Sequence, residues 1–234
     1  MWNVIARSAR ACGSSPMYTW VSNVGRIELS GTTFLNGVSK AANMMRDGLD
    51  AEAGDDVFID LGNHWQSPVW IGAALSVQAV ITSQPENVLA VVSRDSVNDA
   101  QGSREIVVIS RDPFGMPEKN LDASVINGSL EVRGFGDVFS PMGSFQDIDP
   151  VLRNAESVRC LSELRETAAS LIESHNIVTS SRIAVAGITD LLDRAMWHVI
   201  IPVIAQCSVV LLDGIEDHAK TCEVEQVDRL VVID

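Results

Sequence analysis

The sequence predicts an α/β protein with mainly parallel sheets, helices on both faces of the sheets, and two lobes that repeat one pattern. Short apolar runs of strand length alternate with segments of helical periodicity along most of the 234 residues, and this alternation is typical of βαβ units. A helix–strand–helix–strand order occurs twice, which indicates an internal duplication. The matched residues lie 126 to 128 positions apart: Val57 with Ile183, Trp70 with Trp197, and Gln78 with Gln206.

The first predicted elements are two helices. One helical face near the start of the chain holds Trp2, Ile5, Ala6 and Ala9. The first copy of the repeat then opens with a helix over 31–49, where apolar residues recur at spacings of three and four. We expect Thr32 to cap its start and Gly48 to close its end in the left-handed conformation.

The first copy continues with a strand, a second helix and a second strand. The apolar run 57–61 follows a polar turn and predicts a buried strand. Ser67 as N-cap and Pro68 in the first turn open a helix that extends to about Val77. This helix is apolar almost all round, so it must be buried on several sides. Residues 79–82 predict the next strand.

Between the two copies the sequence predicts three more strands, over 87–92, 105–110 and 130–133. The first two end in the same tripeptide, Ser-Arg-Asp, at 93–95 and 110–112.

Two segments rich in Pro, Gly, Asp and Asn predict loops, because they lack periodicity: 112–128 and 140–156. The second loop is the best boundary, and it separates predicted lobes over about 16–140 and 157–234.

The second copy repeats the order of the first. A helix over 161–172, a strand over 183–186, a helix over 190–205 and a strand over 208–212 follow one another. Pro202 is expected to kink the longer helix, because proline has no N–H to donate. A last apolar strand is predicted over 229–233.

The composition and the net charge exclude several classes of partner and several cellular locations. The net charge of −14 repels phosphate backbones and anionic lipids, so we expect neither nucleic acid nor membrane as partner. The four cysteines (Cys12, Cys160, Cys207 and Cys222) are scattered, which is typical of a reducing compartment and predicts no zinc or other metal site. No apolar run is long enough to cross a bilayer and no secretory signal is apparent. We expect a cytoplasmic protein.

Several motifs, taken in order, resemble the opening of acyl-CoA synthetases, which are AMP-binding, adenylate-forming enzymes. The motifs are Leu29-Ser30, Ala41-Ala42-Asn43, Gly54-Asp55-Asp56-Val57, Leu61-Gly62-Asn63, Val77-Gln78-Ala79-Val80 and the segment 185–212. The stretch Glu131–Asp137 is similar to a narrower group, short actinobacterial proteins of unassigned function. The resemblance covers about 16–234 and implies the fold of part of the large domain of an adenylate-forming enzyme.

The departures from the family pattern imply lost chemistry. The family carries a glycine-rich loop with a lysine before its second-copy helix, but residues 154–160 hold neither glycine nor lysine. Such a loop needs glycines so that backbone N–H groups surround phosphate. The family's adenine, magnesium and ribose motifs and its catalytic lysine have no matching residues here. We therefore carry over no catalytic residue and expect no cofactor.

Asn63 and His64 are candidate ligand-binding residues. They follow a predicted strand, and ligands of open α/β sheets bind at the carboxyl ends of strands. His64 has the chemistry of an acid–base group. The alternative is structural: Asn63 and Ser67 cap the next helix while His64 and Trp65 pack on a neighbouring lobe.

Three further candidates are Arg133, Gly134 and Gly136, which form a short glycine motif able to approach an anion. The alternative is a glycine turn that places Phe135 and Phe139 on the core. Thr189 follows the second-copy strand and is a candidate ligand contact or a helix cap. His198, on an apolar helix, is typical of a satisfied core histidine.

These observations favour a non-catalytic binding or assembly protein. The alternatives are a binder of an acyl, CoA or nucleotide ligand and an enzyme of unrelated chemistry on the same fold. The chain stops directly after an apolar strand, whose unpaired groups invite pairing. We therefore expect a homodimer or a protein partner to cover that edge.

Overall fold

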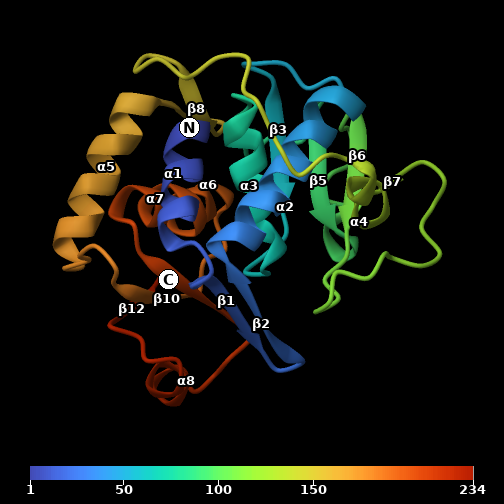
Figure 1. The fold of residues 1–234 in the computed structure, drawn as a ribbon. Coiled ribbons are helices and arrows are strands. Elements are labelled where there is room, and N and C mark those ends of the chain that lie inside the picture. Colours follow the sequence, from blue (N-terminus) through green and yellow to red (C-terminus); the bar gives the residue numbers. More distant parts are fainter. Residues whose placement is uncertain (234) are drawn as a thin grey trace.

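The computed structural model describes residues 1–233 and contains two sheets (Figure 1). The five-stranded sheet has the order β12-β10-β11-β1-β2. Its strands are β1 (Pro16–Ser22), β2 (Gly25–Ser30), β10 (Arg182–Ala186), β11 (Ser208–Asp213) and β12 (Arg229–Val232).

The seven-stranded sheet has the order β7-β6-β5-β3-β4-β8-β9. Its strands are β3 (Asp56–Asp60), β4 (Val80–Thr82), β5 (Leu89–Ser93), β6 (Glu105–Ile109), β7 (Ile126–Asn127), β8 (Pro150–Arg153) and β9 (Val158–Cys160). In both sheets the described pairs are parallel except one at an edge, β1 with β2 and β8 with β9. The predicted fold class is confirmed.

The helices pack around and between these sheets. They are α1 (Trp2–Cys12), α2 (Gly31–Asn43), α3 (Gln66–Ser76), α4 (Gly128–Glu131), α5 (Leu161–Ser174), α6 (Leu191–Ala195), α7 (Ile201–Ala205) and α8 (His218–Val224). Two π-helical turns, Met44–Gly48 and Met196–Ile200, extend α2 and join α6 to α7. Figure 1 shows α1, α2, α3 and α7 gathered at the centre of the molecule. One continuous hydrophobic core contains apolar residues of these helices together with those on one face of each sheet, and a smaller cluster lies on the other face of each sheet.

The predicted duplication agrees with the strand order. Strands β3 and β4 of the first copy are neighbours, as are β10 and β11 of the second, and the strand that follows each copy, β5 or β12, lies on the other side of β3 or β10. Trp70 and Trp197 are both buried on their helices. Gln78 and Gln206 both end a helix in the left-handed conformation, with φ of 65° and 54°. The two copies therefore share strand order, a core tryptophan and a helix terminus.

The helix of the second copy contains a π-helical turn directly before its proline. Pro202 has no N–H to give to the carbonyl of His198, four residues earlier. The π-helical turn Met196–Ile200 lies directly before it, and such turns accommodate irregular pairing. The freed His198 carbonyl accepts a hydrogen bond of 2.7 Å from the buried Tyr18 hydroxyl on β1.

The ends of two helices differ from prediction. Ser30, not Thr32, caps α2, because its hydroxyl accepts from the Thr33 N–H. Gly48 is not left-handed. It lies under Phe135, whose ring would stand 2.7 Å from an added Cβ, so glycine is needed there for close approach. The helix predicted to start at Ser67 starts at Gln66, and Ser67 lies inside it.

Two predictions between the copies are wrong. Residues 130–133 were expected to form a strand, but they belong to α4 and a following 3-10 turn, Val132–Gly134. The expected loop 140–156 contains β8, which pairs with β4.

The sheets also divide the chain differently from the predicted lobes 16–140 and 157–234. Strand β1 pairs with the late strand β11 and carries β2 into the same sheet, whereas β9 joins the sheet of the first copy.

Candidate functional site

The predicted site after β3 is filled by its own side chains. His64 is fully buried. Its ring lies edge-on to Trp20, with centroids 4.8 Å apart, and tilted on Trp65 at 5.4 Å. Burial, helped by the charge of Arg111, lowers the pKa of His64 to about 4. A neutral, enclosed imidazole serves packing, in agreement with the structural alternative.

Asn63 and Ser67 bind His198 instead of capping α3. The His198 Nε2 lies 3.2 Å from Asn63 Oδ1, and its Nδ1 lies 2.9 Å from the Ser67 hydroxyl. Because the amide oxygen only accepts, Nε2 carries the proton and the serine donates to Nδ1. Burial, followed by the charge of Arg194, lowers the pKa of His198 to about 3.

The hydrogen bonds join Ser67, His198 and Asn63 in the order of a nucleophile, a base and an orienting group. However, Ser67 and His198 are fully enclosed, so no substrate reaches them. The trio joins the two sheets, because the Asn63 amide also reaches the Leu212 carbonyl at 3.4 Å. His198 is a satisfied core histidine, as expected, although sequence gave no sign of its two partners.

Ion pairs close the same edge of the sheets. Arg111 binds Asp213 at 2.6 Å, and Asp213 also accepts from the Trp20 indole at 3.1 Å. The buried Arg194 pairs with Asp60 at the end of β3. Arg111 and Arg194 are therefore both engaged by carboxylates and are not free to bind an anion.

Thr189 does not act as a helix cap. Its carbonyl accepts from Arg194 at 2.7 Å while the residue is exposed. Asp190 caps α6 instead, accepting from the N–H groups of Leu192 and Asp193.

The glycine motif after α4 leads into a surface segment, residues 135–140, which is called the strap below. The motif does not form a loop that could surround an anion. Arg133 and Gly134 lie in an exposed 3-10 turn, where the Arg133 guanidinium donates to the Gly115 carbonyl at 2.9 Å. Neither Gly134 nor Gly136 has a positive φ. Phe139 is buried and packs edge-on against Trp2. The structural alternative, a glycine turn that seats aromatic rings on the core, agrees with this geometry.

The strap, residues 135–140, is held by one polar face of α2 and its π-helical extension. Lys40, Asn43 and Arg46 are spaced three residues apart and so share that face. Lys40 donates to the Phe135 carbonyl at 2.8 Å, and Asn43 donates to two further strap carbonyls, both at 2.9 Å. Arg46 donates to the Ser140 carbonyl at 2.9 Å. Sequence analysis missed this contact, although the spacing of the three polar residues is a signal for it.

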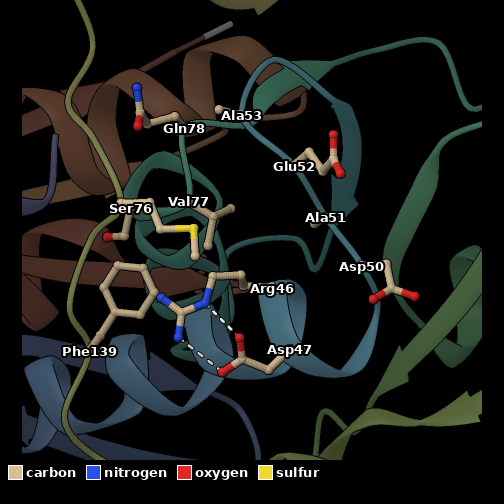
Figure 2. Close-up of a pocket in the computed structure, with 11 residues that line it drawn as sticks. Arg46, Asp47, Asp50, Ala51, Glu52, Ala53, Ser76, Val77, Gln78 and Phe139 are labelled. Atoms are coloured by element: carbon tan, nitrogen blue, oxygen red, sulfur yellow. Dashed lines mark hydrogen bonds and ion pairs between the residues drawn. The ribbon is translucent and has the colours of Figure 1, made fainter.

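Beside the strap lies a cavity of about 450 Å³, at the amino ends of β3 and β4 (Figure 2). Its wall consists of Arg46, Asp47, Asp50, Ala51, Glu52, Ala53, Ser76, Val77, Gln78, Phe139 and Met142. None of the predicted site residues belongs to this wall, because the predicted sites follow the carboxyl ends of strands.

Residues 154–160, which lack glycine and lysine, form a closed turn and the strand β9 that follows it. Residues 154–157 turn between β8 and β9. The side-chain oxygen of Asn154 accepts from the N–H groups of Glu156 and Ser157 at 3.0 and 2.7 Å and from the Ser157 hydroxyl at 3.1 Å. Two amides that an open loop offers to phosphate are therefore already bonded inside the turn.

Two further searches concern residues 1–233. There, no group of three or more His, Cys, Asp or Glu side chains is arranged to hold a metal ion. In the same range, no helix has both the length and the apolar character needed to cross a bilayer.

Comparison with known sequences gives a curated relative whose description names only a numbered family. A TIGR03089 family protein of Mycobacterium tuberculosis is 36% identical over 160 residues, which cover 62% of this chain and 60% of that protein. No protein-family model matches the chain.

Comparison with solved structures shows the fold. An acyl-CoA synthetase of Brucella canis superposes with a TM-score of 0.81 at 14% identity, covering 97% of this chain and 47% of that enzyme. The N-terminal domain of FACL13 from Mycobacterium tuberculosis gives 0.75 at 12% identity, covering 97% and 60%. The chain thus spans about half to three fifths of the proteins that it matches. It has the fold seen in the N-terminal domain of acyl-CoA synthetases, as its sequence motifs implied.

Proposed function

We propose that this chain is a binding protein that does not itself activate carboxylic acids by adenylation. The hairpin at 154–160 carries the proposal. It holds neither glycine nor lysine, and the Asn154 side chain occupies the N–H groups of Glu156 and Ser157. A triphosphate there meets Glu156 beside the single cation Arg159, so these two amides are not free to donate and the segment has no net positive charge.

The exchange of labelled pyrophosphate into ATP tests this proposal. The purified chain is incubated with ATP, magnesium and a panel of short, medium and long carboxylic acids, and an acyl-CoA synthetase in parallel confirms the assay. We expect no acid-dependent exchange above the blank without protein. Exchange that depends on one of the acids refutes the proposal.

Assembly with a second copy is part of the proposed role, and a surface observation favours it. An open groove of about 800 Å³ lies at the carboxyl ends of β5 and β6, and the exposed side chains of Met116 and Leu130 line it. Phe114, close by in sequence, is 81% exposed. Met116 and Leu130 share this groove with charged and polar side chains, and exposed apolar side chains with a polar rim are typical of protein interaction sites.

Light scattering at micromolar concentration tests the assembly. We expect twice the chain mass of 25.3 kDa, falling to the single mass in the variant Met116→Ser/Leu130→Ser. A control variant, Val24→Ser/Val224→Ser, removes two exposed apolar side chains elsewhere and should keep the dimer. A single-chain mass for the wild-type protein contradicts a homodimer.

A further inference from the structure

The cavity of Figure 2 holds four ionisable side chains, and two of them neutralise each other. The Arg46 guanidinium makes paired contacts to Asp47, Nε to Oδ1 at 2.6 Å and one terminal nitrogen to Oδ2 at 2.9 Å. It also donates to Asn43 and to the Ser140 carbonyl, and it stacks on Phe139 at 4.8 Å. Most of its N–H groups are committed, so Arg46 is a wall of the cavity and not a receptor for an anion.

The charge that remains is negative. Asp50 and Glu52 are exposed, and within residues 1–233 their carboxylates make no hydrogen bond or ion pair. Figure 2 shows both on the side of the cavity opposite Phe139. The net charge of −14 adds a field of the same sign, which raises the local concentration of cations.

The other side of the cavity combines apolar groups with Ser76, Gln78 and the paired Arg46. Ala51 and Val77 are buried at its floor, and the Phe139 ring forms part of its wall. Met142 lines the cavity yet is 92% exposed. An adaptable thioether with nothing over it is suited to cover an apolar group that enters.

We propose that this cavity binds a small organic cation, an amine or guanidine joined to a short apolar or aromatic group. The cation contacts Asp50 and Glu52, and the apolar group lies between Val77, Phe139 and Met142. A volume of about 450 Å³ is within the usual range for small-molecule sites. The inference rests on the proposed binding function and supplies the chemical class of its ligand.

Tryptamine is a suitable probe, and indole-3-acetate is its anionic counterpart with the same ring. Titration calorimetry on the full chain measures affinity, and the ¹³C-labelled methyl of Met142 reports where the probe binds. The variant Asp50→Asn/Glu52→Gln removes the two free carboxylates. The control Glu166→Gln/Glu173→Gln removes two exposed carboxylates of α5 and changes the net charge equally.

We expect tryptamine to bind and shift the Met142 methyl signal, and indole-3-acetate to bind at least about tenfold more weakly. The Asp50→Asn/Glu52→Gln variant should lose about fivefold to tenfold in affinity for tryptamine, whereas the control should lose less than twofold. Equal binding of both probes, equal losses in both variants, or no response of Met142 overturns the inference. Pyrophosphate exchange is a separate assay, so adenylation activity refutes the proposed function and leaves this result intact.

Discussion

Replacing Tyr18 with phenylalanine removes one hydroxyl from the core and nothing else. That hydroxyl donates to the His198 carbonyl at 2.7 Å, which Pro202 leaves without its usual helical donor. The ring remains against Phe34, with centroids 4.7 Å apart, so no cavity of side-chain size forms. The cost is that of an unsatisfied buried acceptor, about 1–3 kcal/mol.

Urea unfolding followed by tryptophan fluorescence measures this cost. We expect a lower midpoint with an unchanged slope, since the exposed area of the unfolded chain is the same. The double-mutant cycle with Pro202→Ala provides the control, because alanine returns an N–H at position 202. That second change should recover about half of the loss or more. A loss below about 0.5 kcal/mol for Tyr18→Phe, or no recovery, refutes the account of the proline.

Three further predictions concern stability. Glu225→Gln should destabilise the fold by about 2 kcal/mol at neutral pH. The hydrogen bond from Arg26 lowers the pKa of Glu225 in the folded protein. The stabilisation from Glu225 is therefore present above the pKa of this carboxyl in the unfolded chain, and it disappears as pH falls through the pKa in the folded chain. His198 should make unfolding easier as pH falls from about 6.5 towards about 3, because burial lowers its folded pKa to about 3 and the unfolded chain takes up the proton first. A pH series of urea midpoints for wild type and His198→Gln checks this, and an equally steep decline in both contradicts it. Trp70→Ala and Trp197→Ala should each cost about 3–5 kcal/mol, since both are core residues; a surface-like loss for either tryptophan by the same assay would count against equivalent core positions.

Periodicity predicted the elements well where the buried face was wide. The helix around Trp70 has apolar residues on all sides, and the structure buries it from Ser67 to Ser76. Residues 130–133 were wrongly predicted as a strand, because a four-residue run with two apolar side chains fits a strand and a helical turn equally well. Helix ends were placed less well because neighbouring hydroxyls compete for one cap, as Ser30 and Thr32 do.

The candidate site could be predicted only in part. Sequence placed Asn63 and His64 correctly after a strand, but their burial depends on Trp20, which lies on a distant strand. The cavity beside Phe139 escaped prediction because its wall joins three segments, 46–53, 76–78 and 139–142. Their meeting depends on the hydrogen bonds from α2 and its extension to the strap carbonyls; the spacing of the donors can be seen in the sequence, but the segment that supplies the acceptors cannot.

The paired left-handed glutamines give this molecule an internal reference. Gln78 and Gln206 adopt the same unfavourable φ at the same place in each copy, so glycine relieves the same backbone strain twice, about 1 kcal/mol each time. Their surroundings differ, because Gln78 borders the cavity with Phe139 whereas Gln206 lies beside Cys207 and Ser180. The backbone strain cancels when the two glycine substitutions are compared, so their difference measures how much more one glutamine side chain contributes than the other. Each substitution thus serves as the reference for the other within the same protein.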